Sequence, residues 1–173
     1  MTDVPTADQV AARPPALVLD DVSVVRGGRV VWSQGTLTVP AGAVVGVIGP
    51  NGAGKTTLFQ LVLGMLPPAG GRVEVLGRTP SRGDRRIGYV PQNYTAALGE
   101  AVRARERRVT VLVVAHDLNP LLPVLTDAVY LLDGHPHHDP IDAVVTEDLL
   151  THLYGTPVRV VRTAQGDLFT RGG

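Results

Sequence analysis

The chain has 173 residues, 44% of them hydrophobic and 18% charged, which is enough for one domain with a substantial core. Sixteen basic and sixteen acidic residues give a formal net charge of zero, so no global field attracts nucleic acid or an anionic membrane. Cysteine is absent, which excludes disulfides and thiolate metal sites, and no apolar run approaches the roughly 18 residues of a membrane-spanning helix. We therefore expect a cytoplasmic protein whose contact with a membrane is peripheral.

The N-terminal part is predicted to contribute an antiparallel layer. Residues 1–15 are polar and contain alanine and proline, which predicts a disordered N-terminus, and residues 16–173 are expected to form a single domain. Apolar residues alternate at Ala16–Val25 and Arg29–Val39, on either side of Arg26-Gly27-Gly28. This pattern is typical of a β-hairpin.

The remaining segments predict a mostly parallel core sheet. Val109–Val114 is a continuous apolar run, typical of a strand that is buried on both faces. We expect further strands at Ala43–Ile48, Arg72–Leu76, Ile87–Val90 and Ala128–Leu132, and a hairpin of Val158–Thr163 with Asp167–Thr170. Helices are expected at Gly54–Leu66, Ala101–Arg108 and Thr146–Tyr154. Thr146 is expected to cap the last helix and Gly155 to end it. Strands that alternate with helices indicate an α/β fold.

One loop has a chemistry that its residue types identify. The segment Gly49-Pro-Asn-Gly-Ala-Gly-Lys-Thr-Thr57 fits the pattern G-x-x-x-x-G-K-[ST] and lies between an apolar strand and a helix. Its glycines let backbone N–H groups point inward, and the start of the helix adds a positive end to the same anion cradle. Lys55, the only lysine of the chain, would reach the β- and γ-phosphates, and the Thr56 hydroxyl would bind Mg²⁺. The alternative is a glycine-rich turn without a ligand.

Three segments together resemble the ATP-binding subunits of ABC transporters. Gly49–Thr57, Tyr89-Val-Pro-Gln-Asn93 and Val111–Asp117 are similar to the Walker A motif, the Q-loop and the switch-histidine loop of that family. The resemblance implies an ABC-type P-loop NTPase fold. Three further segments, His116–Pro120, Leu131–Gly134 and Leu153–Val158, are most similar to subunits of zinc and manganese importers.

The resemblance also implies ATP and Mg²⁺ as cofactors and assigns residues to them. Gln92 would bind Mg²⁺ together with Thr56 and would orient the attacking water, and His116 would contact the γ-phosphate. Arg26 stands where the family has an aromatic residue that stacks on adenine, and its guanidinium plane can also stack on a purine. The residues expected to hold the phosphates are Asn51, Gly52, Ala53, Gly54, Lys55, Thr56 and Thr57. By themselves, Gln92 could be a solvated turn residue and His116 an ordinary histidine at a strand end.

The implied partners are a transmembrane permease subunit and a second nucleotide-binding subunit in a homodimer, with the chain peripheral on the inner face of the cell membrane. Nucleic acid is not an expected partner. Arginines are frequent in 103–108, but Glu100 and Glu106 are interleaved with them and no aromatic platform is present. We therefore expect this segment to face solvent.

The chain departs from the family by being internally shortened. His116 follows Gln92 by 24 residues, where the family has a helical subdomain, a Ser-Gly-Gly signature and the Walker B strand. None of the four glutamates follows an apolar strand, so the catalytic base is missing. A positioned general base typically contributes about 10²–10⁴-fold to a rate. We predict that the chain binds Mg·ATP and hydrolyses it negligibly.

Two alternatives to a transporter subunit remain. The first is a non-hydrolysing nucleotide-binding remnant or regulatory module, which the missing glutamate favours. The second is an unrelated phosphoryl-transfer enzyme with the same loop. For the shortened sheet, we expect either that Ile87–Val90 pairs directly with Val109–Val114 or that an apolar edge is left open.

Two further segments are open to a metal-binding interpretation. Val129–Asp133 imitates half of a Walker B motif, but Asp-Gly commonly marks a turn, so Asp133 is interpreted as a turn residue with metal binding as the alternative. His135-Pro-His-His-Asp139 is interpreted as a solvated loop and not as a metal site, because the adjacent His137 and His138 cannot easily converge on one ion.

Overall fold

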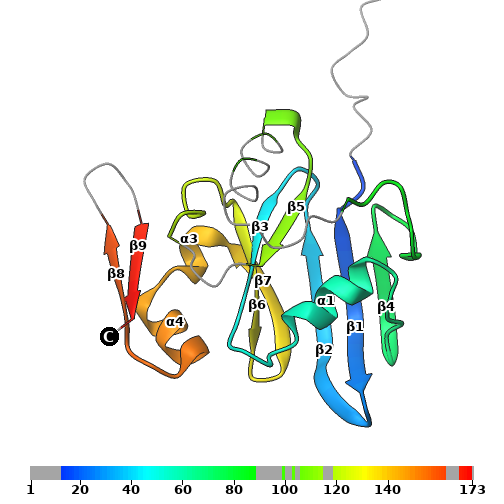
Figure 1. Cartoon of the computed structure of the whole chain (residues 1–173), viewed down its shortest axis with the longest axis horizontal. Coiled ribbons are helices and arrows are strands. Elements are labelled where there is room, and N and C mark those ends of the chain that lie inside the picture. The colour runs from blue at the N-terminus through cyan, green and yellow to red at the C-terminus, as the bar shows by residue number, and fades with distance from the viewer. Residues whose placement is uncertain are drawn as a thin grey trace, which may run out of the picture.

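The computed structural model describes residues 13–88, 99, 103, 106–114, 119–162 and 168–172. In chain order, its elements are β1 (Leu17–Arg26), β2 (Arg29–Val39), β3 (Val44–Ile48), α1 (Lys55–Val62), β4 (Gly70–Val75), β5 (Val111–Val114), β6 (Asp127–Leu132), β7 (His135–Pro140), α3 (Ile141–Val144), α4 (Glu147–Tyr154), β8 (Val158–Arg162) and β9 (Leu168–Gly172). The strands form three sheets with the orders β2-β1-β4, β5-β3-β6-β7 and β8-β9 (Figure 1).

The predicted antiparallel layer is confirmed. Strand β1 pairs antiparallel with β2 on one side and with β4 on the other. Gly27 and Gly28 join β1 to β2 with φ angles of 57° and 75°, a left-handed conformation that glycine adopts without steric cost. The hairpin therefore follows from the two glycines between alternating strands.

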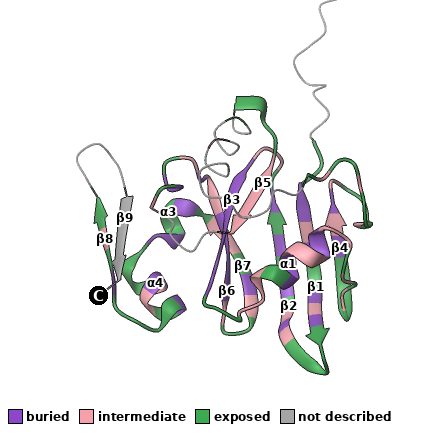
Figure 2. Cartoon of the chain, viewed as in Figure 1, coloured by how far each residue is buried: buried purple, intermediate pink, exposed green. Residues whose placement is uncertain are grey.

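The core sheet is mostly parallel, as predicted. Strand β3 pairs in parallel with β5 along one edge and with β6 along the other, and β7 extends the sheet antiparallel to β6. All five residues of β3 are buried because both faces are covered (Figure 2). Val45 and Val47 pack with the antiparallel sheet and α1, whereas Val44 and Ile48 pack with α3 and α4. This central position fixes the strand that leads into the loop at residue 49.

The two predicted ends of α4 are confirmed. The Thr146 side chain accepts a hydrogen bond from the N–H of Leu149, and Gly155 ends the helix in the left-handed conformation. Beyond it, β8 and β9 form the expected antiparallel hairpin. Figure 1 shows this hairpin beside α4, at the end of the molecule away from β1, β2 and β4.

Helix α1 is shorter than predicted. We expected it to continue to Leu66, but it ends at Val62. Gly64 has a φ of 65°, and its N–H donates to the carbonyl of Leu61. A left-handed glycine closes a helix, so the stop precedes the prolines at 67 and 68.

Residues 135–139 form most of strand β7, so the solvated-loop interpretation is wrong. Asp133 and Gly134 make the turn that joins β6 to β7, with positive φ angles of 50° and 77°. The turn interpretation of Asp133 is thus confirmed. Because the turn is tight, the three histidines pair along β6; His135 and His138 are partly buried, and His137 is exposed on the strand.

The strand predicted at Ile87–Val90 is not formed in its two described residues. Ile87 and Gly88 are not in a strand, and Tyr89 and Val90 lie outside the described residues. Within the described part of the chain, β5 pairs with β3 alone. The predicted pairing of Ile87–Val90 with β5 is thus absent for Ile87 and Gly88, and the rest of that prediction lies outside the described residues.

Candidate nucleotide-binding site

The phosphate loop, residues 49–57, runs from the buried end of β3 into α1. Gly49, Gly52 and Gly54 have φ angles of 148°, 84° and 102°, which side chains rarely adopt. Gly54 is the N-cap of α1, and no side chain caps the helix there. The first N–H groups of a helix have no acceptor within it, so those of Lys55, Thr56 and Thr57 are available to an anion.

The ammonium of Lys55 lies across this loop. Its Nζ donates to the carbonyl oxygens of Gly49, at 2.6 Å, and Pro50, at 2.8 Å. Partial burial lowers the pKa of Lys55 from its ordinary value, because desolvation disfavours the charged form. A phosphate placed beside the ammonium would reverse this penalty by supplying the opposite charge.

The neighbouring hydroxyls face in different directions. Thr56 is exposed, whereas Thr57 is 4% exposed and belongs to the interior. Only the first is therefore free to contact a ligand or an ion in solvent. The loop thus presents inward N–H groups, one ammonium and one hydroxyl, which fits a phosphate chain; for Mg²⁺ the described residues offer the Thr56 hydroxyl.

Trp32 of β2 packs against the phosphate loop at Gly54, a contact that the sequence did not predict. A Cβ atom at Gly54 would lie 2.7 Å from Trp32 Cδ1 and 2.7 Å from Val31 Cγ1. Trp32 is 1% exposed, and its Nε1 has no hydrogen-bond partner in the part of the chain that the structure describes. The alternation of β2 could have marked Trp32 as a core residue, but its contact with Gly54 required the tertiary structure.

Arg26 reaches the same helix. Its Nη1 donates to Gln60 Oε1 at 3.1 Å, which brings the end of β1 against the exposed side of α1. The structure therefore places Arg26 on the helix that begins with Lys55. Gln60, its partner, was not predicted, because the two residues are 34 positions apart.

Gln92 and His116 lie outside the described residues, as do the rest of the Q-loop and residues 115–117 of the switch-histidine segment. The described strand β5 ends at Val114, whose register partner in β3 is Val47. The chain therefore leaves β5 at the edge of the sheet where β3 enters the phosphate loop.

The histidines of β7 do not converge. His135 Nδ1 lies 2.9 Å from the carbonyl oxygen of Ser33, and His137 stacks on Tyr130 with ring centroids 5.1 Å apart. His138 Nε2 lies 3.3 Å from Asp127 Oδ1. Across the described ranges, no three histidines or acidic residues are grouped to hold a metal ion.

The sequence profile of the family described as ABC transporter matches residues 33–156, which is more than half of the chain. The chain belongs to the ABC transporter family. This match includes the whole phosphate loop and every strand of the core sheet.

Relatives named for metal transport match about half of the chain. The zinc transport system ATP-binding protein TroB of Treponema pallidum is 41% identical over 85 residues, which are 49% of this chain and 32% of TroB. The manganese transport system ATP-binding protein MntB of Bacillus subtilis is 45% identical over 74 residues, or 43% of this chain and 30% of MntB. The chain thus spans about a third of the length of these relatives.

Other comparisons widen the range of systems. The lipopolysaccharide export system ATP-binding protein LptB of Haemophilus influenzae is 38% identical over 98 residues, or 53% of this chain and 40% of LptB. A solved metal-chelate type ABC transporter in an inward-facing conformation matches with a TM-score of 0.68 at 15% identity, covering 92% of this chain and 97% of that chain. This likeness supports the ABC-type P-loop fold. No helix in the described ranges is long and apolar enough to cross a membrane.

Proposed function

We propose that this chain is the nucleotide-binding part of an ABC transporter and that it binds Mg·ATP at the phosphate loop with negligible hydrolysis. The observation that carries the proposal is the position of Lys55, whose ammonium spans the loop carbonyls above the free N–H groups of α1. Mg·ATP supplies the anionic oxygens that this arrangement lacks.

Lys55, the loop N–H groups and the Thr56 hydroxyl would each contact Mg·ATP. Lys55 would exchange two neutral carbonyl acceptors for charged phosphate oxygens, which make stronger hydrogen bonds. The N–H groups of residues 51–57 would hold the same phosphates, and the exposed Thr56 hydroxyl would bind the Mg²⁺ that accompanies them. His116 is proposed to contact the γ-phosphate, supported by the exit of β5 beside Val47. Gln92 is proposed to contact the Mg²⁺, and the resemblance of its segment to the family's Q-loop supports this.

Negligible hydrolysis is supported by the positions of the described glutamates. Glu74 lies within β4, and Glu106 lies in a helical segment before β5. Glu147 accepts a hydrogen bond from the N–H of Val160, so it is engaged at the base of β8. None of these carboxylates follows a strand of the core sheet, where a base could activate water at the γ-phosphate.

The cargo is proposed to be a divalent metal ion such as zinc or manganese, taken up through a transmembrane permease to which the chain binds on the inner face of the membrane. The names of TroB and MntB, which are zinc and manganese transport proteins, support this cargo. LptB, a similar protein, is named for lipopolysaccharide export instead. A second nucleotide-binding subunit is proposed as a further partner.

A non-hydrolysing regulatory module is the second candidate, favoured by the missing catalytic glutamate. The two candidates differ in whether the chain associates with a permease. Co-expression with the permease of a zinc importer and with that of a lipopolysaccharide exporter, followed by co-purification, separates them. Retention by the zinc permease alone supports metal import, and retention by neither supports the regulatory module.

Calorimetry of the purified chain with Mg·ATP tests the nucleotide site. Lys55→Ala removes charge-assisted hydrogen bonds worth about 1.5–3 kcal/mol, so affinity should fall about 10–100-fold. Arg85→Ala removes an exposed positive charge that makes no described contact and serves as the control. Equal affinity of the wild type and Lys55→Ala would contradict the proposal. A steady-state rate that Lys55→Ala abolishes would contradict the expected lack of hydrolysis.

A further inference from the structure

Strand β5 has an open edge in the described part of the chain. It pairs with β3, and no second described strand pairs with it. Each of its four residues, Val-Leu-Val-Val, is partly exposed, although every residue of β3 beside it is buried. A continuous apolar strand of a parallel sheet is normally buried, and an edge that no strand pairs is a place where a further strand fits.

The backbone of β5 has hydrogen-bonding groups to offer at that edge. The N–H of Val111 donates to the carbonyl of Ala43 at 3.0 Å, so it points toward β3. Successive residues of a strand point their N–H groups to opposite edges, and those of Leu112 and Val114 therefore point away from β3. Groups of this kind, with which no described strand pairs, are a template for an added strand.

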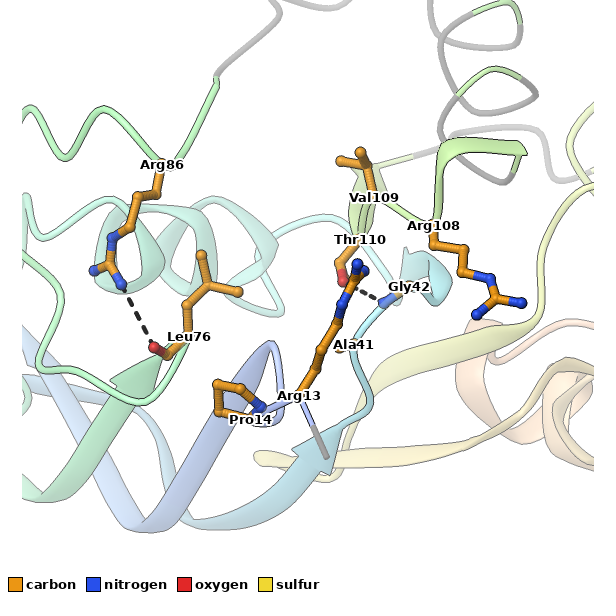
Figure 3. Close-up of a pocket in the computed structure, with 9 residues that line it drawn as sticks. All are labelled: Arg13, Pro14, Ala41, Gly42, Leu76, Arg86, Arg108, Val109 and Thr110. Carbon is orange, nitrogen blue, oxygen red and sulfur yellow. Dashed lines mark hydrogen bonds between the residues drawn. The ribbon is translucent and has the colours of Figure 1, made fainter. Parts of the chain in front are cut away.

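A pocket of about 260 Å³ lies where β5 begins. Figure 3 shows Arg13 reaching toward Thr110 on one side and Arg86 on the other, with Leu76 and Pro14 between them. The wall includes Val109, which is 52% exposed. The pocket thus joins apolar surface to cationic side chains at one end of the open edge.

Two of the three arginines of this pocket have no acidic partner among the described residues. Arg86 is paired with Asp84 and also donates to the carbonyl of Leu76. Arg13 and Arg108 have no ion pair within the described ranges. Arg108 has a φ of 53°, in the left-handed region, and its backbone packs against Gly42. Since the whole chain has no net charge, this positive potential is local.

We propose that the open edge of β5 binds an extended peptide segment of another protein, aliphatic or β-branched in the part that pairs, with acidic residues at the end that meets Arg13 and Arg108. Main-chain hydrogen bonds to Leu112 and Val114 would supply affinity, and the arginines would select the charge and the direction of the strand. A second copy of this chain is a poorer occupant, because residues 109–114 carry no carboxylate to face these arginines.

Binding of short labelled peptides, followed by fluorescence anisotropy, tests the proposal. The probes are Asp-Asp-Val-Thr-Val-Ile-Val, the same residues with the two aspartates moved to the C-terminus, and a version with asparagine in place of both. A parallel strand places the N-terminal aspartates at the arginines, and an antiparallel strand places the C-terminal ones there. We expect one acidic peptide to bind one-to-one and at least tenfold more tightly than the asparagine version.

Variants of the chain locate the contact. Arg108→Glu should weaken the preferred acidic peptide at least tenfold, whereas Arg85→Glu, an exposed charge reversal outside the pocket, should not. Leu112→Pro removes an N–H that points away from β3, so it should abolish binding without breaking the β3–β5 ladder. Peptide binding should slow amide exchange at Leu112 and Val114 in the wild type, which does not depend on any variant folding.

Three results would overturn the inference: equal binding of the acidic and asparagine peptides, unchanged amide exchange in β5, or a concentration-dependent dimer in light scattering that protects the same amides. The inference is independent of the nucleotide site. Lys55→Ala should leave peptide binding unchanged while it removes the Mg·ATP heat, so failure of one proposal is distinguishable from failure of the other.

Discussion

Trp32 packs directly against Gly54, the residue at which the phosphate loop becomes helix α1. A Cβ atom at Gly54 would lie 2.7 Å from Trp32 Cδ1 and 2.9 Å from its Nε1, closer than real contacts allow. A core residue of the antiparallel sheet thus sets the position of the first turn that carries Lys55. The geometry of the candidate site depends on packing between two layers.

Gly54→Ala should destabilise the fold more than Gly52→Ala does. Both glycines have positive φ angles, which cost a substituted residue about 1–3 kcal/mol. At Gly54 the added methyl also meets Trp32, and overpacking costs about 1–3 kcal/mol more. A Cβ at Gly52 meets nothing within 4 Å. Urea unfolding measures both variants, and equal losses of stability would show that Trp32 does not constrain the loop.

Trp32 should report nucleotide binding by its fluorescence. It is the only tryptophan of the chain, and its buried indole touches the start of α1. Ordering of the phosphate loop around Mg·ATP should therefore change the intensity or the wavelength of its emission. Titration of Lys55→Ala, at concentrations that saturate the wild type, provides the control. A response that is the same in both proteins would arise from something other than the loop.

Gly35→Ala should separate the two packed sheets at one point. Gly35 does not have a positive φ, but a Cβ there would lie 2.6 Å from Pro136 Cγ of β7. We expect a loss of about 1–3 kcal/mol from overpacking. Pro136→Ala removes the clashing atom, so in a double-mutant cycle it should recover part of this loss, with the rest due to Trp32 Cζ3 at 3.0 Å. Strict additivity of the two changes in urea unfolding would refute the contact.

Tyr130 should ionise late and contribute to stability at moderately alkaline pH. Burial first, and then its hydrogen bond to Asp139 and the charge of that residue, raise the pKa of Tyr130 to about 12. Because the folded pKa lies above the ordinary value of 10.0, the stabilisation is present below that pH and is lost as the pH rises toward 12.

Phenolate absorbance during an alkaline titration measures this effect. Tyr130→Phe should remove the late component, and Asp139→Asn should move it toward lower pH. Tyr154→Phe is the matched control, since burial alone raises the pKa of Tyr154 and it has no described hydrogen-bond partner. An alkaline titration of Tyr130→Phe that matches that of the wild type would contradict the assignment.

The sequence by itself determined the features that depend on neighbouring residues. The glycines of the phosphate loop, the hairpin turn at Gly27-Gly28, the Thr146 cap and the Gly155 stop were all predictable, because backbone sterics and short-range hydrogen bonds act over a few residues. The three segments Gly49–Thr57, Tyr89–Asn93 and Val111–Asp117, taken together, likewise identified the family before any contact was known.

Only the tertiary structure decided which distant segments meet. Residues 135–139 were interpreted as a solvated loop because a histidine-rich tract is only a compositional hint, yet pairing with β6 makes them a strand. The contact of Trp32 with Gly54 also lay beyond prediction, whereas an open apolar edge was one of the two outcomes expected for the shortened sheet. Such features depend on register and on which face of each strand is buried, and these are settled by packing of the whole core and not by local preference.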